Sequence, residues 1–151
     1  MQRKLDNTLI GAAGVHYVAS ELSLRGLIAL PTIRNAPGVD LVEVTSTGTW
    51  HANVQVKTSQ HKVGFWPIGK KFREWRGSDN YYAFVRWLPA ESRFEAFLET
   101  ADRVIDDASR AIEAERKKGH KEWSPCWPLP KDAVSVERLR KQWQDFGVDS
   151  K

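Results

Sequence analysis

The chain has little cysteine and no long apolar run, and both shortages limit what it can be. Its single cysteine, Cys126, excludes an intramolecular disulfide framework and a cysteine-based zinc cage. No apolar segment approaches the roughly 20 residues that span a bilayer, and the N-terminus lacks the continuous apolar core of a secretory signal. We therefore expect a protein that does not enter a membrane and works in a reducing, cytoplasmic compartment.

Histidines with metal-binding spacing are also missing. None of His16, His51, His61 and His120 belongs to an HxH or HExxH pattern, which argues against a histidine zinc site. Cys126 lies between prolines with no partner base near it in sequence, so a catalytic thiol is not expected.

The 151 residues, 41% hydrophobic and 28% charged, are typical of one globular domain. The net charge of +4 is unevenly distributed, because residues 1–80 hold ten Lys and Arg against six Asp and Glu, whereas residues 81–151 are balanced. This excess suits a polyanionic partner. Seven tryptophans add large, flat surfaces to either the core or an interface.

Apolar periodicity and turn residues predict an α+β or α/β domain with a mixed central sheet. A first helix is expected over residues 7–25, with Asn7 as its N-cap and two glycines, Gly11 and Gly14, that allow close approach to another element. Its apolar stripe consists of Gly11, Val15, Val18 and Leu22. Strands are expected at 27–33, 39–44, 50–58, 81–88 and 94–98.

The C-terminal third is expected to contain two helices separated by an irregular arm. Thr100 is a candidate cap of the second helix, and a short closing helix covers residues 135–146. The intervening segment 122–131 carries three prolines and two tryptophans. We expect a single domain over residues 1–151, with a core at about 7–118 and the arm and closing helix at 119–151.

Three polar residues of the hairpin at 38–57 form a candidate site. Asp40 lies near the start of one strand, and Gln55 and Lys57, two positions apart near the end of the next, share one face. Phosphodiester cleavage needs a bound divalent metal and a nearby cation, and magnesium takes only one or two protein carboxylates. Asp40, the Gln55 amide oxygen and the Val56 backbone carbonyl would hold Mg²⁺ or Mn²⁺, and Lys57 would hold the attacking water or the phosphate.

Simpler interpretations of these residues remain open. Asp40 follows Gly38 and would stabilise a turn, and Gln55 and Lys57 would form the solvent-facing side of an edge strand.

The order of these motifs resembles a known family. A helix with a glycine-rich start, then GVD, then a hairpin ending in QVK is similar to the PD-(D/E)xK nuclease superfamily, in particular its small resolvase-like and restriction-endonuclease-like members. The resemblance covers residues 11–98. It implies an αβββαβ core, a metal site at Asp40, Gln55 and Lys57 in the Gln-x-Lys variant, and DNA as substrate.

One position departs from the family pattern. Val15 stands where the first helix of the family carries a glutamate. Either Glu21 reaches the site from the edge of the helix stripe, or the site works with Asp40 alone, or it does not cleave. The rival hypothesis is therefore a catalytically degenerate module that binds nucleic acid or a protein partner. A third is a purely structural domain.

The run from Lys57 to Arg76 is basic and aromatic, with Glu74 as its one acid. Such a composition is typical of a nucleic-acid groove, although a solvated loop anchored by its tryptophans is the alternative. The expected DNA-binding residues are Lys62, Trp66, Lys70, Lys71, Arg73 and Arg76. Because a small domain has one site and duplex cleavage needs two, a homodimer is expected.

Overall fold

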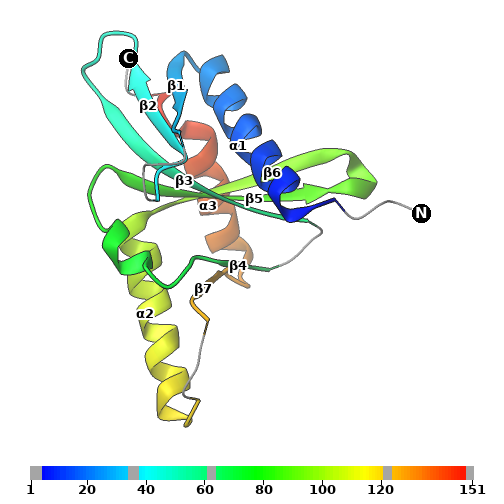
Figure 1. The fold of residues 1–151 in the computed structure, drawn as a ribbon, viewed down its shortest axis with the longest axis vertical. Coiled ribbons are helices and arrows are strands. Elements are labelled where there is room, and N and C mark those ends of the chain that lie inside the picture. Colours follow the sequence, from blue (N-terminus) through cyan, green and yellow to red (C-terminus); the bar gives the residue numbers. More distant parts are fainter. Residues whose placement is uncertain (1–4, 34–37, 61–63, 121–123, 149–151) are drawn as a thin grey trace.

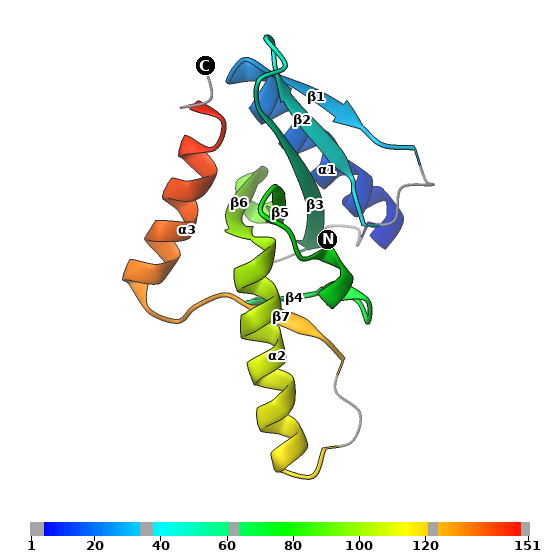
Figure 2. The same cartoon turned by 90° about the vertical axis from the view of Figure 1, so that its left-hand side faces the viewer.

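The computed structural model describes residues 5–33, 38–60, 64–120 and 124–148. In chain order its elements are α1 (Asn7–Leu24), β1 (Leu27–Pro31), β2 (Leu41–Thr45), β3 (His51–Gln60), β4 (Phe65–Pro67), the 3₁₀ turn η1 (Phe72–Trp75), β5 (Asn80–Leu88), the 3₁₀ turn η2 (Pro89–Glu91), β6 (Arg93–Thr100), α2 (Ala101–Lys117), β7 (Cys126–Pro128) and α3 (Ala133–Asp145). Figure 1 and Figure 2 show them in two orthogonal views. The expected α+β class with a mixed sheet is confirmed.

Five strands form the main sheet in the order β1-β2-β3-β5-β6. Only the pair β3–β5 is parallel, and the other three neighbouring pairs are antiparallel. β1, which contains Pro31, is an edge strand, as the proline predicts. The αβββαβ order places a helix between the third strand and its parallel neighbour, whereas here β4 and the single turn η1 make that connection.

The sheet separates two cores. One face, here called the α1 face, includes Val54, Val56, Ala83 and Val85, which pack with α1 and the end of α3. The opposite face, the α2 face, includes Tyr82 and Phe84, which pack with α2, η1 and the β4–β7 pair. Within the described residues no helix is long and apolar enough to cross a membrane.

Helix α1 buries Val18 and Leu22 of the predicted stripe, but Ile10 and Gly14 take the places of Gly11 and Val15 in its first half. Its buried residues are Ile10, Gly14, Val18 and Leu22, and the side chain of Asp6, rather than Asn7, caps it by accepting the N–H of Thr8. At Gly14 helix α1 lies closely against β3, because a Cβ there would overlap the side chain of Thr58. Gly11 has no neighbour within 4 Å of its Cβ position, so the expected contact there is wrong.

The arm after α2 is part of the core. β7 pairs with β4, and the Trp127 ring stacks on Phe84 with centroids 4.2 Å apart and planes 7° from parallel. α3, which begins two residues earlier than predicted and is capped by Asp132, adds Trp143 to the core of the α1 face. Of the six tryptophans in the described residues, four are buried: Trp66, Trp75, Trp127 and Trp143.

A glutamate lies within the core of the α1 face. Glu43 on β2 has no solvent-exposed surface, and neither carboxyl oxygen has a hydrogen-bond partner among the described residues. Its cross-strand neighbours are Ala29 and Ala52, whose small side chains leave room for it. Burial raises the pKa of Glu43 to about 7 because the charged form loses its hydration.

The two glycines of α1 predict opposite responses to alanine. Gly14→Ala forces a methyl group into Thr58 and should lower the free energy of unfolding by about 1–3 kcal/mol. Gly11→Ala meets no neighbour and should raise it by about 1 kcal/mol, because alanine has the higher helix propensity. Urea denaturation of both variants measures the difference; equal effects would contradict the packing of α1 on β3.

Glu43 predicts a stability that falls with rising pH. Its pKa is about 7 in the folded state and near 4.5 in the unfolded chain, so the unfolded state releases this proton first and is favoured as pH rises between these values. The loss is on the order of 3 kcal/mol. Glu43→Gln should remove this component when unfolding is measured at pH 5 and pH 8. The exposed Glu137→Gln serves as control, and an unchanged slope in Glu43→Gln would refute the assignment.

Candidate functional site

Asp40 lies immediately before β2 and binds the edge of β3 that faces β2. Its backbone N–H donates to Val54 O at 3.1 Å, and its Oδ2 accepts the N–H of Val56 at 2.7 Å. Because β2 begins at Leu41, the carboxylate takes the position that a strand residue opposite Val56 would occupy. The N–H and the C=O of one strand residue point toward the same side of the strand. The carbonyl of Val56 therefore points toward Asp40, as its N–H does.

Gln55 and Lys57 project from the α2 face of β3, opposite Tyr82 and Phe84 of β5. Burial lowers the pKa of Lys57, and the charge of Asp40 acts against that decrease. Burial raises the pKa of Asp40, while the hydrogen bond from Val56 and the charge of Lys57 lower it. The two half-buried groups therefore support each other's charged forms.

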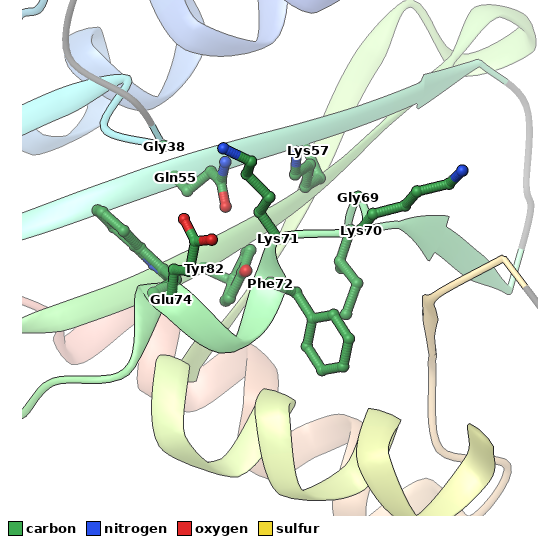
Figure 3. Close-up of a pocket in the computed structure, with 11 residues that line it drawn as sticks. Gly38, Gln55, Lys57, Gly69, Lys70, Lys71, Phe72, Glu74 and Tyr82 are labelled. Carbon is green, nitrogen blue, oxygen red and sulfur yellow. The ribbon is translucent and has the colours of Figure 1, made fainter. Parts of the chain in front are cut away.

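A pocket of about 380 Å³ opens beside these residues, within the size range of small-ligand sites. Figure 3 shows the side chains around it. Strands β3 and β5 form one wall, and η1 with the preceding loop forms the other. The lining residues are Gly38, Gln55, Lys57, Ile68, Gly69, Lys70, Lys71, Phe72, Glu74, Trp75 and Tyr82.

The η1 wall is held in place by four contacts. The Trp75 indole N–H donates to Tyr81 O at 3.4 Å, and the Asn80 side chain donates to Trp75 O at 3.0 Å. Arg76 pairs with Asp106 of α2 at 2.7 Å and with Asp102 at 3.5 Å. The side chains that η1 presents to the pocket therefore have a fixed backbone position.

The residues expected to bind nucleic acid separate into different environments. Lys70 and Lys71 are exposed and line the pocket, and in Figure 3 Lys71 extends toward Gln55 whereas Lys70 points away from it. The exposed Arg73 lies over the Phe72 ring at 4.5 Å. Lys62 lies outside the described residues.

Two of the expected contacts do not fit the structure. Trp66 is 1% exposed and donates its indole N–H to Val85 O at 2.9 Å, so it is a core residue that presents no face to a base. Arg76 is paired with two carboxylates of α2 and holds η1 rather than offering a free guanidinium.

The first helix supplies no carboxylate to this pocket. Glu21 pairs with Arg25 at 3.4 Å and lines a separate pocket that Arg93 and Arg140 also border. Val15 packs against the core of the α1 face, on the other side of the sheet from Gln55 and Lys57. Glu21 is therefore wrong as a substitute for the missing glutamate.

Two polar pocket residues, Glu74 and Tyr82, had no role in the sequence-based site. Glu74 stood out only as the one acid of a basic run, and its carboxylate turns toward Gln55 in Figure 3. Tyr82 is fully buried, its hydroxyl has no hydrogen-bond partner among the described residues, and burial raises its pKa to about 12. No sequence signal pairs Tyr82 with Gln55, because their alignment follows from the parallel register of β3 and β5.

Comparison of the chain with protein-family models, curated proteins and solved structures finds no match in any of the three. The donor groups must therefore be judged on their own geometry.

The available oxygens suit a weakly held Mg²⁺. Among the described residues no group of three or more His, Cys, Asp and Glu side chains is placed to hold a metal. Asp40 uses Oδ2 for Val56, and neither its Oδ1 nor the Gln55 amide has a hydrogen-bond partner in the described part of the chain. One carboxylate with neutral amide and backbone oxygens fits magnesium, which keeps several of its waters.

The coupling of Asp40 and Lys57 predicts a measurable titration effect. Lys57→Met removes the nearby positive charge and should raise the pKa of Asp40 further. The Lys57 charge stabilises the ionised carboxylate, and without it less would offset the effect of burial. Carbon-13 NMR titration of the Asp40 carboxyl measures this pKa. Lys70→Met, at an exposed position, should leave it unchanged, and an equal rise in both variants would show that Lys57 is not its specific partner.

Proposed function

We propose that the protein is a metal-dependent DNA endonuclease of the PD-(D/E)xK kind, acting through Asp40, Gln55 and Lys57. The observation that carries this proposal is the joint position of the Asp40 carboxylate, the open edge of β3 at Val56 and the half-buried Lys57, beside a pocket with two further lysines. A carboxylate, neutral oxygens and a desolvated ammonium are the groups that phosphodiester hydrolysis uses.

Each residue has a distinct task in this proposal. Asp40, the Gln55 amide oxygen and the Val56 carbonyl would hold the ion, and Mg²⁺ or Mn²⁺ would offset phosphate charge and favour hydroxide formation from bound water. The ammonium of Lys57 lies on the pocket side of β3 and would hold the phosphate or orient the water. Lys70 and Lys71 at the other wall would contact neighbouring phosphates of the strand.

Cutting both strands of a duplex requires two such sites. A homodimer with two-fold symmetry would supply them, because it presents the same site twice in opposite directions.

A second candidate is a module that binds nucleic acid or a protein partner without cleavage. Val15 stands at the position where the family has a glutamate on the first helix. Gln55 would add no negative charge to the proposed metal site. The lysines of the pocket would still bind phosphate, because that attraction does not depend on a metal.

Cleavage assays separate the two candidates. Supercoiled and branched DNA are incubated with the protein and Mg²⁺ or Mn²⁺, beside Asp40→Asn, Lys57→Ala and the exposed control Lys117→Ala. The endonuclease should lose activity about a hundredfold or more in the first two variants and keep it in the control.

The remaining outcomes are equally informative. DNA binding without cleavage under either metal, unaffected by Asp40→Asn, would replace the endonuclease with the binding module. Absence of both binding and cleavage would refute both candidates.

A further inference from the structure

The proposed metal site contains one carboxylate, Asp40, and Val15 stands where the family that the sequence resembles has a second carboxylate on the first helix. In this structure α1 covers the opposite face of the sheet, and Glu21 is committed to Arg25. Any second carboxylate must therefore reach the site from the α2 face. Among the described residues that line the pocket, Glu74 is the one acid.

Glu74 lies on η1, directly across the pocket from β3. Figure 3 shows its carboxylate turned toward the Gln55 amide, with Tyr82 and Lys71 at the same end of the pocket. The turn cannot move freely, because the buried Trp75 beside it bonds to β5 and Arg76 pairs with α2. The backbone position of Glu74 is thus set by its buried neighbour and by α2.

The carboxylate of Glu74 has no ion-pair partner among the described residues. Glu74 is exposed and has Lys70, Lys71 and Arg73 as neighbours in sequence, yet it forms no ion pair with any described residue. By contrast, Asp102 and Asp106 of α2, the nearest acids in the adjoining helix, are both paired with Arg76. Glu74 is left available to a ligand in the pocket.

Tyr82 lies at the same end of the pocket and has a polar group left unsatisfied by the described residues. Tyr82 is fully buried, lines the pocket opposite Gln55, and its hydroxyl has no partner in the described part of the chain. A buried hydroxyl without a partner costs about 1–3 kcal/mol, and a ligand in the pocket, such as a metal-bound water, would offset this cost by forming the missing hydrogen bond.

We propose that Glu74 supplies the second carboxylate of a divalent-metal site formed with Asp40 and Gln55, in place of the helix carboxylate that Val15 replaces. This inference rests on the proposed metal-dependent function. Two carboxylates and the amide oxygen would hold Mg²⁺ or Mn²⁺ more tightly than Asp40 and neutral oxygens alone, because the second carboxylate adds a further negative charge.

Metal binding can be measured without any cleavage reaction. Tb³⁺ is added to the full-length protein, and its luminescence is excited through tryptophan, since Trp75 lines this pocket. Competition with Mn²⁺ and Mg²⁺ gives their affinities. Glu74→Gln should weaken binding at least tenfold, and Glu74→Asp should weaken it less. Asp79→Asn, an exposed acid of the same segment outside the pocket lining, should bind as the native protein does.

The outcomes separate this inference from the function on which it rests. If Asp40→Asn weakens metal binding and Glu74→Gln does not, Glu74 is no ligand and the proposed function stands. If Asp79→Asn weakens binding as much as Glu74→Gln, the effect is general surface charge and the inference fails. If the native protein binds none of the three ions, the metal-dependent function fails with it.

Discussion

The parallel pairing of β3 with β5 is the constraint on which the rest of the structure depends. It aligns Gln55 with Tyr82 and Lys57 with Phe84, so polar and aromatic side chains share the α2 face. A parallel neighbour also requires a crossover connection rather than a tight turn. That crossover carries β4, η1 and the lysines across the α2 face, and it forms the second wall of the pocket.

Two carboxyl groups of the hairpin, the half-buried Asp40 and the buried Glu43, show how local partners decide the role of the same functional group. Asp40 has a backbone N–H and an ammonium beside it, which keep its charged form accessible despite burial. Glu43, three residues on and facing the α1 side, has neither, so burial raises its pKa to about 7. The first is suited to binding a cation, and the second makes folding sensitive to pH.

The tryptophans serve the pocket indirectly. Trp127 stacks on Phe84 and Trp66 packs at a tilt against both rings, so the crossover and the C-terminal arm are buried in one cluster. Trp75 does the same for η1 through its bond to β5. The buried aromatic residues of the basic run therefore fix the backbone from which Lys70, Lys71, Arg73 and Glu74 project.

Alternation and helical periodicity in the sequence determined the order of the elements, because apolar spacing reports which side of a strand or helix is buried. The shared face of Gln55 and Lys57 followed from the same rule. Contacts between distant segments were decided only by the tertiary structure. These contacts include the packing of Gly14 against Thr58, the burial of Trp66, the pairing of Arg76 with α2 and the position of Glu74 across the pocket from Gln55. Each of these contacts joins residues that are far apart in the chain. Apolar spacing reports which side of a strand or helix is buried, but not which distant segment covers that side.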